Sequence, residues 1–106
     1  MDRITQLKQY LEESPDDPFL YYALATEYTQ KDVEKAIHYY EILLARFPAY
    51  TGTYYHAAAL YEALEEIEKA RLVYEKGITV LTEQQAHKLL EELKNAYYNF
   101  QMEYDE

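Results

Sequence analysis

Residues 54–64 read YYHAAALYEAL, and residues 21–28 read YYALATEY. In each stretch two tyrosines come first, and a third tyrosine follows a run of mostly small residues. Tyr21, Leu24, Ala25 and Tyr28 lie at positions i, i+3, i+4 and i+7, which is the spacing of one face of an α-helix. The two stretches therefore predict two similar helices, each with large aromatic rings beside small side chains.

The similarity continues beyond these two helices. Each is followed by a second apolar stripe of helical spacing, which contains Glu-Lys-Ala at 34–36 and again at 68–70. Matching residues are 33 positions apart in the first helix of each pair and 34 positions apart in the second, so the first copy has a turn that is one residue shorter. A helix pair that recurs with this period indicates a solenoid, in which each repeat packs on its neighbours.

The repeated residues resemble the tetratricopeptide repeat. In that family the first helix carries a large aromatic residue, leucine, a small residue and tyrosine, and the second carries alanine, an aromatic residue and a closing proline. The matching residues of the first copy are Tyr21, Leu24, Ala25, Tyr28, Ala36, Tyr40 and Pro48. Those of the second copy are Tyr54, Ala57, Ala58, Tyr61, Ala70 and Tyr74, with Thr82 in place of the proline.

The resemblance implies an all-α fold, a right-handed α-α superhelix of about six antiparallel helices. We expect one domain over residues 1–106, made of a half-repeat helix at 1–16, repeat one at 17–48, repeat two at 49–82 and a C-terminal capping helix at 83–106. A capping box of Thr82 and Gln85 would start the last helix. The apolar stripe expected on that helix is Ala86, Leu89, Leu90, Leu93, Tyr97 and Phe100.

Small residues should set the distance between paired helices. Ala25 is expected to face Ala36, and Ala58 to face Ala70, so that the large tyrosines fill the gaps between successive pairs. Ala58 and Ala70 should therefore be almost inaccessible to solvent. Neither turn within a repeat contains the glycine that is usual there, which leaves the geometry of those turns undetermined.

Composition and charge exclude several classes of partner. The chain has 10 basic and 20 acidic residues, for a formal net charge of −10, whereas nucleic acids and anionic membranes are bound largely by basic side chains. Neither is therefore an expected partner.

The chain has no cysteine, which excludes disulfides and thiol chemistry. It has no membrane-spanning apolar run and no secretory signal, so we expect a cytoplasmic location.

The sequence contains no pattern of an enzyme, a metal site or a cofactor site. His38, His56 and His87 lack the i, i+4 spacing of a metal-binding helix. The two glycines, Gly52 and Gly77, stand alone, so they cannot form a glycine-rich phosphate loop. We therefore expect no catalytic activity, no metal and no cofactor.

The remaining candidate is a protein-binding surface. Tyr22 and Tyr55 each follow a tyrosine of the predicted core and point about 100° away from it around the helix. In proteins that resemble this chain, that neighbouring face lines a concave groove that binds peptides. The candidate peptide-binding residues are Phe19, Tyr22, Thr26 and Thr29 in the first copy and Tyr55, His56, Ala59 and Glu62 in the second.

The chemistry of this face favours an apolar or basic segment as the partner. The family's groove for a C-terminal carboxylate uses lysine, arginine and asparagine, whereas the positions that match its lysine and asparagines here are Tyr22, Thr26 and His56. The predicted function is therefore a non-enzymatic protein–protein interaction, by capture of a peptide or protein segment on the concave face.

Self-assembly is the alternative prediction. A half-repeat at one end and an aromatic tail at the other are both open to stacking, and Tyr98, Met102 and Tyr104 of the tail have no assigned role. In this hypothesis the terminal helices pair with a second copy and form a homo-oligomer. Phe100, Met102 and Tyr104 should in either case be packed on the body or covered by another subunit.

Overall fold

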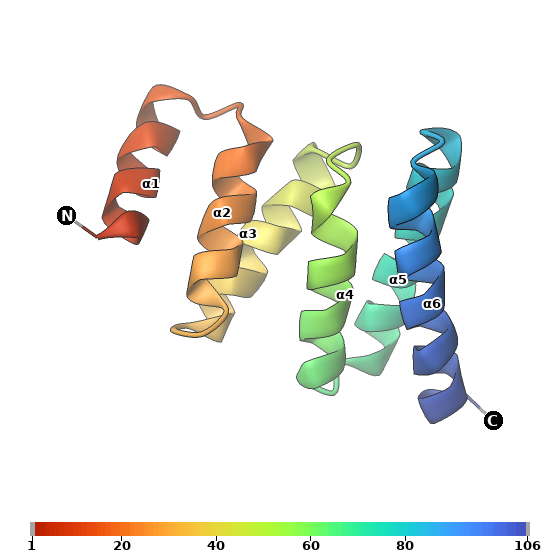
Figure 1. Ribbon diagram of the computed structural model, residues 1–106. Coiled ribbons are helices and arrows are strands. Elements are labelled where there is room, and N and C mark those ends of the chain that lie inside the picture. Colours follow the sequence, from red (N-terminus) through yellow and green to blue (C-terminus); the bar gives the residue numbers. More distant parts are fainter. Residues whose placement is uncertain (1, 106) are drawn as a thin grey trace. The chain divides into compact units, whose positions relative to one another are not determined.

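The computed structural model describes residues 2–105; Met1 and Glu106, the two ends of the expected domain, lie outside the described residues. In this part of the chain there are six helices and no strand, which confirms the predicted all-α class (Figure 1). The helices are α1 (Arg3–Glu13), α2 (Pro18–Tyr28), α3 (Val33–Arg46), α4 (Gly52–Ala63), α5 (Ile67–Glu83) and α6 (His87–Tyr104).

The chain forms two compact units, which we call unit 1 (Met1–Thr53) and unit 2 (Tyr54–Glu106). In unit 1, α2 packs against both α1 and α3. In unit 2, α5 packs against α6 and also touches α4, because Gly77 of α5 lies next to Tyr54. Each unit therefore contains one of the two repeated helix pairs and one further helix that packs on it.

The repeated residues form the cores of these units. Ala58 and Ala70 are fully buried, as predicted, and so are Ala25 and Ala36. Six tyrosines of the repeat pattern are also at most 6% exposed, namely Tyr21, Tyr28, Tyr40, Tyr54, Tyr61 and Tyr74. Alanine allows the helix backbones to approach, and the tyrosine rings fill the space on either side.

The α1–α2 and α3–α4 turns have the same hydrogen bonds around Pro15 and Pro48. In both, the residue before the proline donates its N–H to the carbonyl four residues back, at 2.8 Å. The second residue after the proline then donates its N–H to the carbonyl of the residue that precedes the proline, at 3.2 Å in the α1–α2 turn and 2.9 Å in the α3–α4 turn. A residue that precedes proline disfavours the helical conformation, so α1 and α3 end at the same point of the repeat.

The α4–α5 and α5–α6 turns share a different geometry. Glu65 and Gln85 have φ angles of 61° and 56°, in the left-handed region. The next residue in each turn donates its N–H to the carbonyl five positions back, at 2.9 and 3.0 Å. This is the Schellman motif, whose left-handed position glycine usually occupies. The α4–α5 turn, which lies within repeat two, therefore closes without the usual glycine, and the α5–α6 turn closes in the same way; each places a side chain in a left-handed conformation, which is costly.

The predicted capping box at Thr82 and Gln85 is wrong. Thr82 lacks the conformational restriction of the proline it replaces, so α5 continues to Glu83 and the Thr82 hydroxyl donates to the carbonyl of Ile78 at 2.6 Å. Gln85 takes the left-handed position of the turn instead. The capping helix therefore begins at His87 and not at residue 83, and Ala86 before it supplies no side-chain cap.

The expected stripe of α6 also needs a correction, because Leu89 is 42% exposed. Leu93 and Phe100 are both 1% exposed, and Leu90 and Tyr97 are half-buried. The packed stripe therefore runs through Leu90 and Leu93, and Leu89 lies at its edge, about 100° from Leu90 around the helix.

Candidate functional site

In unit 1 three of the four candidate residues lie on α2, and Thr29 directly follows its end. Phe19 is 47% exposed, in the first turn of the helix. Tyr22 is half-buried, and its ring centroid lies 5.7 Å from that of Tyr50. Thr26 and Thr29 are half-buried, and their hydroxyls donate to carbonyls of α2 at 2.9 Å. Phe19 is therefore the residue of this group with the largest accessible apolar surface.

In unit 2 the other four candidates lie together on α4. Tyr55, Ala59 and Glu62 are spaced so that they share one face of the helix. Tyr55 is 48% exposed, and its ring meets that of the exposed His56 edge-on, at a centroid distance of 5.8 Å and an angle of 72°. Ala59 is exposed and Glu62 is half-buried. An accessible aromatic ring thus stands beside a small side chain on the surface of unit 2.

An open hollow of about 500 Å³, which we call the α4–α6 hollow, adjoins this face within unit 2. It is lined by Ala59, Glu62, Ala63, Glu65, Glu103 and Tyr104. Sequence reasoning identified two of these six residues. Ala63 could have been found, because it follows Ala59 by four residues on the same face of a helix. Glu103 and Tyr104 could not, because only the packing of α6 brings its last turn to this place.

Glu62 is held at the edge of the hollow by Tyr74 of α5. The Tyr74 hydroxyl donates to Glu62 Oε1 at 3.0 Å. Burial, and after it this hydrogen bond, raises the pKa of Tyr74. In repeat one the matching residues are Tyr40 and Thr29; burial raises the pKa of Tyr40 to about 12, and its hydrogen bond with Thr29 acts in the opposite direction. Both repeats thus tie the end of the first helix to a buried tyrosine of the second.

The hollow carries an uncompensated negative charge. Among residues 2–105, no basic side chain forms an ion pair with Glu62, Glu65 or Glu103. Neither α4 nor residues 97–105 contain a lysine or an arginine. Elsewhere in unit 2, by contrast, Arg71 pairs with two carboxylates, those of Glu68 and Asp105. A concave surface of one charge sign attracts groups of the opposite sign.

In the described part of the chain, no three histidine, aspartate or glutamate side chains come close enough together to hold a metal ion. Nor does any helix there have both the length and the apolar composition needed to cross a membrane.

The repeated helix pairs, the repeated turns and the tyrosine-rich cores define a helical-repeat protein. No family model matches the chain, and no curated protein matches it. Several solved structures, by contrast, match the chain. A tetratricopeptide repeat domain protein from Salinibacter ruber, determined in solution, is 37% identical, with a TM-score of 0.80 over 88% of this chain and 95% of that chain.

Two crystal structures give further matches. The tetratricopeptide repeat domain protein from Salinibacter ruber is 38% identical, with a TM-score of 0.75 over 80% of this chain and 97% of that chain. The MamA protein shares the fold, with a TM-score of 0.67 at 20% identity over 97% of this chain and 66% of that chain.

This chain belongs to the tetratricopeptide repeat family, as its repeated residues predicted. Domains of this fold generally act as scaffolds for protein–protein interaction and generally lack enzymatic activity.

Proposed function

We propose that this chain binds a peptide or protein segment on the concave face of its repeats, without catalysing a reaction. The binding residues would be the candidates on α2 and α4 described above. An apolar or basic segment suits them, because aromatic rings and carboxylates are the groups that they offer. We place the protein in the cytoplasm, with neither nucleic acid nor membrane as a partner, since its net charge of −10 opposes both.

The exposure of Tyr55 is the observation that carries this proposal. Tyr54 and Tyr55 are adjacent and chemically identical, but Tyr54 is fully buried and Tyr55 is 48% exposed. A rigid aromatic ring with a polar hydroxyl gains much contact area on binding at a low entropic cost. The Tyr54 ring is thus explained by its place in the core, and binding of a partner would explain why the Tyr55 ring is exposed.

A matched pair of variants tests the proposal. Partners would be captured from native lysate on the immobilised chain, and the dissociation constant of a captured protein would then be measured. We expect Tyr55→Ala to weaken binding by about 2 kcal/mol, or roughly thirtyfold. Tyr98→Ala removes a more accessible ring, 62% exposed, from α6 and should leave binding unchanged. Equal affinities of the parent and Tyr55→Ala would refute the proposal.

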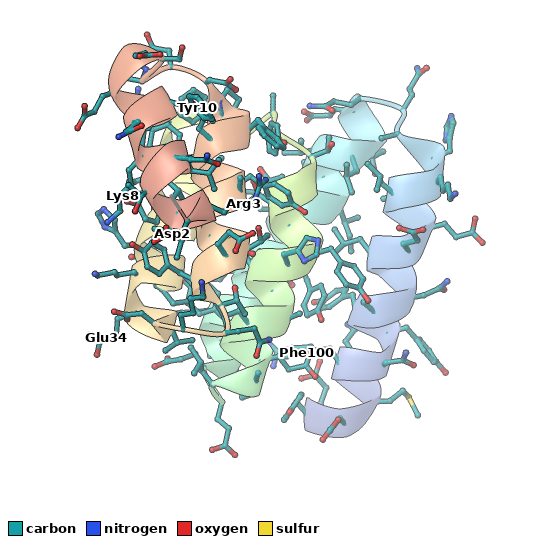
Figure 2. The ribbon with its side chains drawn as sticks, turned by 60° about the vertical axis from the view of Figure 1, so that its left-hand side comes forward. Asp2, Arg3, Lys8, Tyr10, Glu34 and Phe100 are labelled. Carbon is teal, nitrogen blue, oxygen red and sulfur yellow. The ribbon has the colours of Figure 1, made fainter. Side chains whose placement is uncertain are left out.

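A second candidate function, self-assembly through the terminal helices, is favoured by exposed side chains on α6 and α1. Tyr98 and Met102 are 62% and 68% exposed and lie one turn apart on α6, whereas Phe100 between them is packed in the core. Tyr10 on α1 is 53% exposed (Figure 2). Pairing with a second copy would bury these apolar groups. Light scattering over a concentration series tests this candidate, since a mass equal to one chain throughout would contradict it.

A further inference from the structure

We propose that Arg71 of α5 is a positioning residue, which keeps the last turn of α6 folded and thereby holds Tyr104 beside the binding face of α4. This inference rests on the proposed function and deepens it, because it adds Tyr104 to the binding surface and names the side chain that keeps it there. Three features carry it, namely the weak local support of the last turn, the contacts of Arg71 and the place of Tyr104 at the α4–α6 hollow.

The last turn of α6, residues 101–104, makes few buried contacts of its own. Before it the helix is well anchored, since Leu93 and Phe100 are each 1% exposed. After Phe100, residues 101–103 are exposed and Tyr104 is 36% exposed. A terminal turn with so little buried surface is expected to fray unless another part of the fold holds it.

The end of α6 also lacks the charges and the cap that usually stabilise a helix C-terminus. Its last turn contains no basic residue and carries Glu103, whose negative charge is unfavourable at the negative end of the helix dipole. Asp105, which follows the helix, has φ −107° and ψ 134°, so the chain leaves α6 in an extended conformation without the left-handed turn seen after α4 and α5. A cation from another helix should therefore contribute strongly to this turn.

Arg71 provides that cation from α5. Its guanidinium donates to the Asp105 carboxylate at 2.7 Å and lies 5.3 Å from the centre of the buried Phe100 ring (Figure 2). The side chains of this ion pair are 22% and 34% exposed. Those of Arg46 and Asp16, which form an ion pair in unit 1, are 49% and 87% exposed. Because solvent and salt screen a less exposed pair less, the bond from Arg71 to the end of α6 should be the stronger of the two.

The bond from Arg71 to Asp105 fixes the position of Tyr104, the preceding residue. The Tyr104 ring centroid lies 5.0 Å from that of Phe100. Tyr104 lines the α4–α6 hollow together with Ala59 and Glu62, two of the candidate binding residues on α4. A ring that is accessible but already held in place adds contact area for a bound segment at a low entropic cost. Fraying of the last turn would remove this ring from the surface.

Two variants test the positioning role without any partner. Asp105→Ala removes the carboxylate that joins Arg71 to the end of α6. The matched control, Glu68→Ala, removes the other carboxylate that pairs with Arg71, which lies on α5 itself. Hydrogen exchange of the Glu103 and Tyr104 amides would be followed by NMR in the full chain. We expect exchange to be roughly threefold faster or more in Asp105→Ala and close to that of the parent in Glu68→Ala.

The nuclear Overhauser effects between the rings of Tyr104 and Phe100 should also weaken in Asp105→Ala. Exchange as slow in Asp105→Ala as in the parent would show that the last turn is folded without Arg71, and would overturn the proposal. Equally faster exchange in Asp105→Ala and Glu68→Ala would show a general effect of charge around Arg71, and would overturn it as well.

A double-mutant cycle tests the consequence for binding. The probe is a captured protein whose affinity falls in Tyr55→Ala. Tyr104→Ala and Asp105→Ala should each weaken its binding by roughly threefold or more. The double variant should bind no more weakly than Tyr104→Ala, because the position of the turn no longer matters once the ring is gone. Additive losses would show that the ion pair does not act through Tyr104, and would refute the positioning role in binding.

The outcomes separate this inference from the proposed function. If no captured protein depends on Tyr55, the proposed function fails and with it the binding role of Tyr104, whereas the exchange rates alone decide whether Arg71 holds the last turn. If a captured protein depends on Tyr55 but binds Tyr104→Ala as tightly as the parent, the proposed function stands and the addition of Tyr104 to the surface is wrong.

Discussion

A Cβ atom on Gly77 would lie 2.7 Å from Tyr54 Cβ and 2.6 Å from Leu93 Cδ2. The three helices of unit 2 therefore meet at a position where no side chain fits. Repeat one has Leu43 at the matching position, and that side chain is fully buried. The two repeats thus fill the same place differently, and the fully buried ring of Tyr54 depends on the missing side chain of Gly77.

Gly77→Ala should destabilise the protein, although alanine favours a helix by about 1 kcal/mol over glycine. The added methyl group would press on Tyr54 Cβ, which cannot move without its helix, so we expect a net loss of about 1–3 kcal/mol. Urea unfolding followed by circular dichroism measures it. Gly52→Ala is the control, since its nearest neighbours would be 3.3 Å or more from the new atom. A Gly77→Ala protein as stable as the parent would contradict the close contact.

Tyr54→Ala and Tyr55→Ala should differ sharply in stability. Tyr54 is fully buried, so its truncation should cost about 3–5 kcal/mol of unfolding free energy. Tyr55 is 48% exposed, and its truncation should cost about 1 kcal/mol or less. Thermal unfolding of both variants checks this. Equal and large losses would show that both rings belong to the core, and would remove the main residue of the proposed binding surface.

Glu66→Asp should stabilise α5 by giving it an N-cap. Asp32 caps α3 at the matching position of repeat one, where its carboxylate accepts from the Lys35 N–H at 3.3 Å. Glu66 makes no such bond. The shorter side chain of aspartate suits this geometry, so we expect the free energy of unfolding to rise by about 1 kcal/mol. Glu68→Asp, in the first turn of the same helix, should give no comparable gain when the two variants are compared in urea.

Thr53→Val should leave the protein equally stable or more stable. Thr53 is 1% exposed, and within residues 2–105 its hydroxyl has no hydrogen-bond partner. Valine has nearly the same shape without the buried polar atom, so we expect the free energy of unfolding to rise by up to about 1–3 kcal/mol. A clear loss in a thermal melt would show that this hydroxyl makes a stabilising hydrogen bond in solution.

The buried Tyr40 should make the stability fall at high pH. Burial raises its pKa from 10.0 to about 12 in the folded state. Below pH 10 the phenol is neutral in both folded and unfolded chains, so the full contribution of Tyr40 to the free energy of unfolding is present. As the pH rises towards 12, the unfolded chain loses the proton first, which favours the unfolded state. Urea unfolding at several pH values measures this loss. Tyr40→Phe should show a smaller decline, and an equal decline in both proteins would contradict this prediction.

Local patterns of the sequence were sufficient for the helices and for their pairing into repeats. Apolar residues at helical spacing define the buried stripes, and Pro48 ends α3 because the residue before a proline disfavours the helical conformation. The agreement between Tyr21 and Tyr54 in burial follows from the same periodicity. Such features depend on neighbours in the chain, which the sequence displays directly.

The tertiary structure decided how equivalent residues differ. Tyr22 and Tyr55 occupy the same position of the repeat, but Tyr22 packs against Tyr50, and Tyr55 remains exposed. The α4–α6 hollow likewise exists only because the last turn of α6 brings Glu103 beside the end of α4. Residues far apart in the chain make these contacts, so neither periodicity nor spacing could reveal them. Exposure and local charge, which govern binding, arise from this packing.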